Sequence, residues 1–287
     1  MKKAESFKDR IEKLVNKSIF FNKKSSNYFH HLVLIDAVKS LVSLDFDNSK
    51  NNEIISWLES AFPINIKNNK KHLEIKVSNA SFKELKEVLI NKEKNKIDNI
   101  LVNFNMLTEG TQLLEFFLEM SLYQSGKSFI NIWRSLKIFK FIKVKDKVSF
   151  YKLMSTFIFD DNFREDFCFD DKDSLTINMI SDNQNDIIFY ANLIDCMNSE
   201  FIRKKDIDNA LASMLFYFRK TVNLDSPIEV YYDQKKKDRV SILSLINDKK
   251  IDINYNNILL LDSSRILIKN NQYISESFLN NIYNKLK

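Results

Sequence analysis

The spacing of apolar residues predicts a mainly helical chain. In residues 5–18, apolar side chains recur at helical intervals with lysines and glutamates between them, which is the pattern of an amphipathic helix. The same period predicts further helices at about 31–44, 51–61, 82–89, 97–104, 113–120, 128–136, 187–194, 207–218, 240–246 and 278–283.

Three other segments favour β-hairpins. Between residues 64 and 77, apolar and polar residues alternate strictly around a polar turn at 68–71, as expected for two half-buried strands. A second hairpin is predicted at 140–153, although the apolar positions before it also fit one helix that continues past Lys140. A third hairpin is predicted at 258–268 with its turn at 262–264, and a short strand at 228–232.

The order helix, helix, hairpin resembles tandem winged-helix proteins, such as plasmid replication initiators and small accessory subunits of chromosome-condensing complexes. The resemblance covers residues 31–153 and rests on element order alone. We therefore expect a mainly α protein with short β-hairpins and winged-helix-like units in two domains. The expected parts are a basic N-terminal domain (1–158), an acidic connecting segment (159–183) and a C-terminal α+β domain (184–287).

The amino-acid composition narrows the classes of fold and function that are possible for this protein. Only two glycines and two prolines occur among 287 residues, which disfavours nucleotide-binding folds that need glycine-rich loops. The two cysteines, Cys168 and Cys196, lack the spacing of a zinc site or a disulfide framework. We expect them to be reduced in a cytoplasmic protein. No apolar run approaches the length of a membrane span, so no membrane partner is expected.

Charge is distributed unevenly along the chain. The net charge is +10 over residues 1–158, −9 over 159–200 and +5 over 201–287, which gives the overall +6. Two basic regions on either side of an acidic one favour an anionic partner such as nucleic acid, with duplex DNA as the expected form, and also permit a protein partner or self-association.

The stretch from Thr111 to Leu153 holds the candidate nucleic-acid site. If residues 128–137 form a recognition helix, its exposed side is expected to carry Lys127, Asn131, Arg134 and Lys137. Asparagine and arginine can read base edges, and lysines contact phosphates. The expected phosphate contacts beyond the helix are Lys140, Lys143, Lys145 and Lys147. The alternative is an amphipathic helix whose charges only keep the protein soluble.

No catalytic signature appears. Gly126-Lys127-Ser128 is part of a phosphate-loop pattern, but the earlier glycine of that motif is replaced by Ser121. The acidic segment contains Asp160, Asp161, Asp170 and Asp171, which we expect to bind a partner and which can also supply carboxylates for magnesium. No metal site or cofactor is predicted.

Three functional hypotheses follow. The first is a non-enzymatic DNA-associated protein or accessory subunit of a mobile-element, replication or phage-defence assembly. The second is a protein-interaction scaffold that does not bind nucleic acid. The third is a metal-dependent nuclease that uses the acidic segment.

Overall fold

The computed structural model describes residues 2–20, 29–61, 81–107, 110–164, 179–181, 183–221, 227–232, 244–248, 251–270, 272–274, 282 and 284–286. Helices dominate this part of the chain. They are α1 (Lys2–Ser18), α2 (His31–Val42), α3 (Asn51–Ser60), α4 (Phe82–Ile90), α5 (Ile97–Leu107), α6 (Thr111–Leu122), α7 (Lys127–Ile138), α8 (Lys147–Phe159), α9 (Gln184–Met197), α10 (Lys204–Thr221) and α12 (Tyr255–Lys269). The prediction of a mainly helical chain is confirmed.

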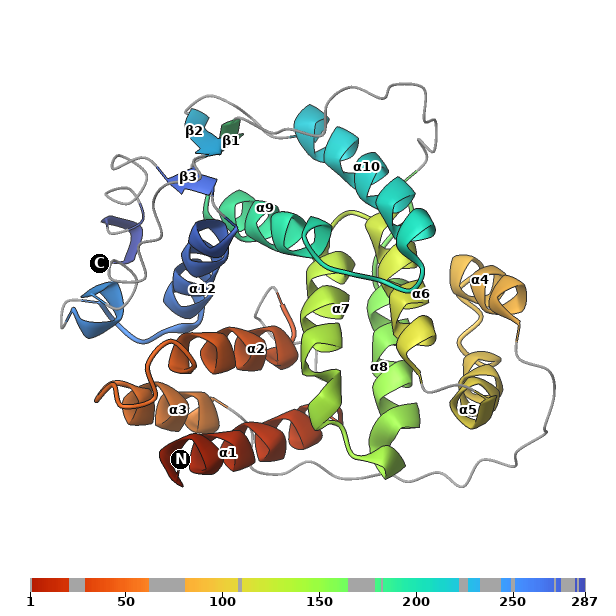
Figure 1. Cartoon of the computed structure of the whole chain (residues 1–287). Coiled ribbons are helices and arrows are strands. Elements are labelled where there is room, and N and C mark those ends of the chain that lie inside the picture. Colours follow the sequence, from red (N-terminus) through yellow and green to blue (C-terminus); the bar gives the residue numbers. More distant parts are fainter. Residues whose placement is uncertain are drawn as a thin grey trace.

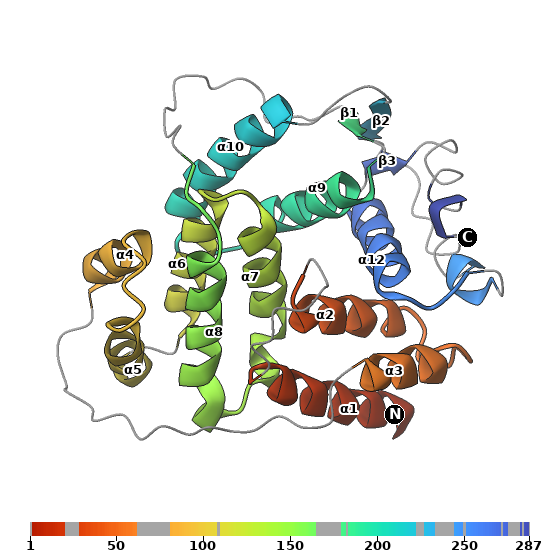
Figure 2. The ribbon, with the colours of Figure 1, turned by 180° about the vertical axis from the view of Figure 1, so that it is seen from behind.

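Helices α6, α7 and α8 pack side by side in the centre of the molecule (Figure 1). Helix α2 crosses α7 and also contacts α1, α3 and α12, while α12 packs on α9 and α10 packs on α6. Seen from behind, α8 lies in front of the central group, and α4 and α5 form a pair at its edge (Figure 2). The central position of α7 leaves little of its surface for solvent.

A small antiparallel sheet accompanies the helices. Its strands, in the order β1, β2, β3, are β1 (Met179–Ser181), β2 (Pro227–Tyr232) and β3 (Gln272–Ile274). Met179 pairs with Glu229, and Val230 pairs with Ile274. Strand β2 coincides with the strand predicted at 228–232. Its neighbours come from distant parts of the sequence, so this sheet is not one of the predicted hairpins.

The predicted hairpin at 140–153 is wrong. Two short 3₁₀ turns, η1 (Phe139–Phe141) and η2 (Val144–Asp146), lead directly into α8. In α8, Phe150, Met154 and Ile158 are buried at intervals of four residues, which is the helical period. That period outweighs the local alternation of apolar and polar residues at 142–148.

The predicted hairpin at 258–268 is also wrong, because these residues form the middle of α12. The Asp-Ser-Ser sequence at 262–264 had favoured a turn. In the helix, the hydroxyls of Ser263 and Ser264 donate to the carbonyls of Leu259 and Leu260, so both buried serines are satisfied without a turn.

The winged-helix expectation is overturned with these hairpins: the described residues form an all-α body apart from the three short strands. The predicted hairpin at 64–77 lies outside the described residues. One cluster of buried apolar side chains joins elements from 1–158 to α9, α10 and α12. The division into two domains at 159–183 stays a prediction.

Candidate nucleic-acid interface

The two residues that were expected to read bases lie in the protein core. Asn131 is 4% exposed and Arg134 is 0% exposed. The Asn131 side-chain oxygen accepts a hydrogen bond from the backbone N–H of His30 at 2.9 Å, the residue that caps the start of α2. The prediction that Asn131 and Arg134 face solvent is wrong, because α2, α6, α8 and α9 all pack against α7.

Arg134 is the centre of a buried charge network that joins four helices. Its Nη1 atom donates to Asp36 of α2 at 2.9 Å and to Asp262 of α12 at 2.5 Å, and its Nε atom donates to Asn192 of α9 at 2.5 Å. Both aspartate side chains are fully buried. Because a buried charge is costly without a partner, these contacts explain how α7 carries an arginine in the core.

Lys137, one turn after Arg134, extends the network. Its Nζ atom lies 2.6 Å from an Asp195 carboxylate oxygen and 3.7 Å from Asp36. Lys39 also pairs with Asp36. Lys137 is therefore only partly available at the surface, and its first role is to neutralise buried carboxylates.

The network determines the ionisation of its aspartates. Burial alone raises the pKa of Asp36, but the charges of Lys137, Lys39 and Arg134 outweigh burial and hold that pKa well below its usual range. The pKa of Asp195 is lowered in the same way, with Lys137 as the main opposing charge. Burial lowers the pKa of Arg134, and Asp262 and Asp36 more than compensate, so its pKa is raised. Asp36, Asp195 and Arg134 are therefore all charged at neutral pH.

Acidification is expected to destabilise the protein through these carboxylates. Since the folded-state pKa values of Asp36 and Asp195 lie below the unfolded value of about 3.9, their stabilisation is present above about pH 4 and is lost as the pH falls further. Urea unfolding measured at falling pH should show this loss. In Asp36→Asn, the slope of unfolding free energy against pH should decrease by up to about 1.4 kcal/mol per pH unit.

The control for this measurement is Asp252→Asn, which makes the same change at an exposed position. Its slope should match that of the wild type. A slope in Asp36→Asn that equals the wild-type slope would show that Asp36 does not titrate abnormally in the folded protein.

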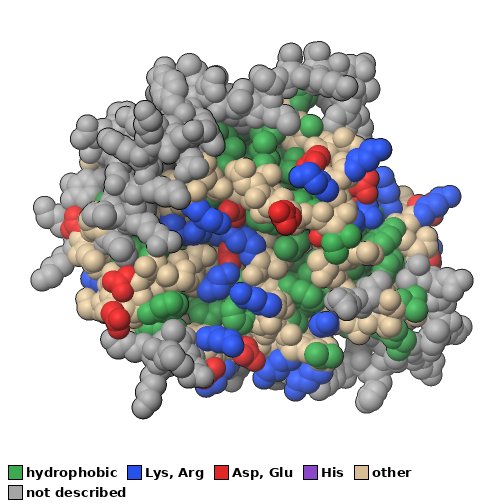
Figure 3. Space-filling view, in the orientation of Figure 1, with side chains coloured by type: hydrophobic (Ala, Val, Ile, Leu, Met, Phe, Trp, Pro, Cys, Tyr) green, Lys and Arg blue, Asp and Glu red, His purple; other side chains and the backbone are tan. Residues whose placement is uncertain are grey.

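The basic side chains of the network reach one face of the molecule. Lysines and arginines gather there where α12, α2, α7 and α1 meet (Figure 3). Lys39, Lys137 and Arg265 are partly exposed, and Lys269 is 65% exposed. This face has an excess of positive charge above the buried aspartates.

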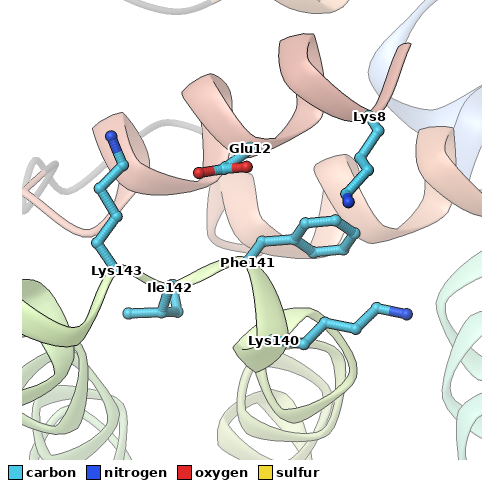
Figure 4. Close-up of a pocket in the computed structure, with 6 residues that line it drawn as sticks. All are labelled: Lys8, Glu12, Lys140, Phe141, Ile142 and Lys143. Carbon is cyan, nitrogen blue, oxygen red and sulfur yellow. The ribbon is translucent and has the colours of Figure 1, made fainter. Parts of the chain in front are cut away.

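A groove of about 410 Å³ lies next to this region, between α1 and the η1 segment that follows α7. It is lined by Lys8, Glu12, Lys140, Phe141, Ile142 and Lys143. The Phe141 ring points toward Lys8, while Lys140 and Lys143 extend to either side of it (Figure 4). The Lys140 ammonium lies 5.4 Å from the centre of the Phe141 ring. Three lysines and one glutamate give the groove a net positive charge.

The backbone beside the groove is held in place by Asn16. Its side-chain amide donates to the carbonyls of Glu12 and Phe141, and its oxygen accepts from the N–H of Lys143 at 3.2 Å. One side chain of α1 therefore fixes the segment that carries Lys140 and Lys143. Both lysines are exposed, so they project into solvent from an ordered backbone.

The remaining predicted lysines lie at other positions. Lys145 is exposed in η2, just beyond the groove, and Lys147 lies over the Phe139 ring at 5.4 Å. Lys127 is exposed at the opposite end of α7. Lys8 was not among the predicted phosphate contacts, because residues 5–18 show only the pattern of an amphipathic helix.

In the Gly-Lys-Ser segment, a carboxylate of the chain itself takes the place that a phosphate-loop motif gives to a backbone-bound phosphate. Asp161 accepts hydrogen bonds from the Ser125 hydroxyl at 2.7 Å and from the Ser128 backbone N–H at 3.3 Å. A carboxylate thus occupies the start of α7, where an anion is favoured. Asp160 lies 3.9 Å from Lys94, whereas Asp170 and Asp171 lie outside the described residues.

The described residues provide neither a metal cluster nor a membrane-spanning helix. They contain no group of three or more His, Cys, Asp or Glu side chains placed to hold a metal ion. Among the helices that the structure describes, none is both long and apolar enough to cross a membrane.

Comparison with known proteins identifies no relative. No family model matches the sequence, no curated protein matches it, and no solved structure matches its fold.

Proposed function

We propose that this protein binds nucleic acid without catalysis, through the groove formed by α1 and the η1 segment. The observation that supports the proposal most directly is that the fold brings Lys8 next to Lys140 and Lys143 around an aromatic ring. Lysines contact phosphates, and an aromatic face can stack on a base.

Binding within the groove itself is proposed to be independent of base sequence. Arg134 and Asn131 would have read base edges, but both are buried. The groove retains lysines, which bind phosphate as point charges. The DNA or RNA is therefore expected to be recognised by its backbone charge. A role in a mobile-element, replication or phage-defence assembly stays a prediction from the sequence.

The test is the double substitution Lys140→Glu with Lys143→Glu. Fluorescence anisotropy with a labelled duplex should show at least about a tenfold loss of affinity near 50 mM salt. If both lysines neutralise phosphates, the slope of log affinity against log salt should also become less steep by about 1.8 for a duplex. The single change Lys8→Glu should weaken binding in the same direction.

The matched control is Lys83→Glu with Lys86→Glu, which changes the total charge equally. Both lysines are exposed on α4, at the opposite edge of the molecule from α1 (Figure 1). An equal loss of affinity in the control would show that only net charge matters. Absence of wild-type binding to both duplex and single strands at low salt would refute the proposed function.

A further inference from the structure

A second, smaller cavity lies at the other end of α7. It has a volume of about 150 Å³, and its lining comes from the starts of α7 and α9, the end of α10 and the residue just before the α2 cap. The groove residues Lys140 and Lys143 follow the C-terminal end of α7, so the two sites are separated by the whole helix. At a rise of about 1.5 Å per residue, that separation is roughly 18 Å.

The walls of this cavity are aromatic. Phe29, Phe189, Tyr217 and Phe218 all line it. The rings of Phe189 and Phe218 are 4.9 Å apart between centroids and inclined by 31°. Phe29 is fixed by two backbone hydrogen bonds with the Tyr255 hydroxyl, at 3.0 and 2.9 Å. Flat apolar faces are therefore held in place around the cavity.

Gly126 allows this wall to form. Its φ of +111° is one that side-chain-bearing residues rarely adopt, and a Cβ atom there would lie 2.6 Å from Cε2 of Phe189. The absence of a side chain at Gly126 lets the Phe189 ring approach the start of α7 closely. The same glycine that suggested a phosphate loop thus shapes an aromatic cavity.

The polar groups of the cavity differ from those of the groove. Lys127 and Asn185 are exposed, and Asp186 is partly exposed. An ammonium, an amide and a carboxylate lie around the aromatic walls. Together they can contact a phosphate, a carbonyl oxygen and an N–H donor of one planar ligand.

The volume limits the ligand to a single ring. A cavity of about 150 Å³ accepts a molecule of the size of benzene, whereas sites for drug-sized ligands begin near 300 Å³. Among planar rings with both carbonyl and N–H groups, a pyrimidine nucleobase matches this size and polarity. Stacking on aromatic side chains with hydrogen bonds to the base edge is a common way to hold an unpaired base.

We propose that this cavity binds one pyrimidine base, stacked against Phe189. Asp186 accepts from the N3–H of uracil or thymine or from the N4 amine of cytosine, Asn185 pairs with the base edge, and Lys127 contacts the attached phosphate. The base can belong to a free nucleotide or to a single strand. Only the second case rests on the proposed function.

Two sets of titrations test whether the cavity binds a pyrimidine base. They also show whether that base belongs to a free nucleotide or to a single strand. Calorimetric titration with UMP, CMP, AMP and inorganic phosphate examines free ligands. Anisotropy with oligo(dT) and oligo(dA) of about 15 nucleotides examines strands. We expect saturable UMP or CMP binding at least about tenfold tighter than AMP binding, or an oligo(dT) preference of the same size.

The variants that identify the site are Asp186→Asn and Lys127→Ala at the exposed rim, and Phe189→Leu in the wall. The two rim changes should keep the fold and reduce the pyrimidine preference at least about fivefold. The matched control, Asp208→Asn on the exposed side of α10, should retain it. A preference that persists in all three variants would overturn the assignment to this cavity.

The outcomes separate this inference from the proposed function. UMP binding without affinity for duplex or single strands would support the cavity and refute the function. Strand binding without UMP or CMP binding and without a base preference would refute the cavity and leave the function intact. Equal affinity for AMP and UMP would contradict the single-ring limit.

Discussion

Replacing Arg134 with methionine is expected to lower the free energy of unfolding by about 3–5 kcal/mol, because it removes the fully buried cation that Asp36 and Asp262 share. Asp36 and Asp262 both bind the same guanidinium nitrogen, and Asn192 binds the Nε atom. Methionine nearly fills the space but supplies no hydrogen-bond donor. Urea denaturation followed by circular dichroism measures the loss.

The control is an arginine in an ion pair at the surface. Arg10 donates to both Glu59 oxygens, at 2.9 and 2.7 Å, yet its side chain is 25% exposed and that of Glu59 is 41% exposed. Arg10→Met should therefore cost less than about 1 kcal/mol. Similar losses of unfolding free energy in the two variants would indicate that burial does not make the Arg134 interactions stronger than those of a surface ion pair.

A triple variant shows whether charge or shape causes the loss of stability in Arg134→Met. When Arg134→Met is combined with Asp36→Asn and Asp262→Asn, the three fully buried charges are removed together. Most of the lost stability should return, because an unpaired charge costs more than a missing pair. A triple variant as unstable as Arg134→Met alone would show that shape, not charge, makes Arg134 necessary.

The helices were predictable because their burial follows the helical period. In α10, for example, Ile207, Ala210, Leu211 and Met214 are buried, and the sequence pattern alone indicated them. The hairpins at 140–153 and 258–268 failed for a physical reason. Polar residues inside α12 form hydrogen bonds with backbone carbonyls of the same helix or with Arg134. A prediction that treats every polar residue as exposed assigns such residues to a turn.

The buried network had a signal in the sequence. Asp36 stands within the apolar run 32–38, and Asp262 follows the apolar run 258–261. An aspartate inside such a run is buried with its neighbours and requires a cationic partner. The partner itself could not be predicted, because Arg134 lies 98 residues from Asp36 and 128 from Asp262.

The candidate site was predictable only in part. Lys140 and Lys143 were selected from local charge, and they line the groove. Lys8 joins them through packing of α1 against the η1 segment and through the Asn16 hydrogen bonds. Contacts between such distant segments leave no periodic pattern, so residues that meet across helices escape prediction from a single sequence.

The second large effect is expected from Gly110→Ala, which should destabilise the protein by about 2–4 kcal/mol through backbone strain and overpacking. Gly110 precedes α6 with a φ of +92°. A Cβ atom there would lie 1.9 Å from the Tyr151 hydroxyl oxygen and 2.9 Å from its Cζ atom. Tyr151 is fully buried, so the ring cannot move aside without disturbing α8.

The clash can be separated from the strain by changing Tyr151 to phenylalanine. Burial raises the pKa of Tyr151 to about 12, so its hydroxyl is neutral at pH 7, and that hydroxyl has no hydrogen-bond partner among the described residues. Tyr151→Phe alone should therefore change stability by less than about 1 kcal/mol.

In the double variant, the closest contact of the new methyl group is removed, while the left-handed backbone at residue 110 remains strained. Gly110→Ala should then cost at least about 1 kcal/mol less in the Tyr151→Phe background than in the wild type. The double-mutant cycle by urea denaturation measures this coupling. Additive effects would show that the contact with the Tyr151 hydroxyl contributes nothing measurable to the cost of Gly110→Ala.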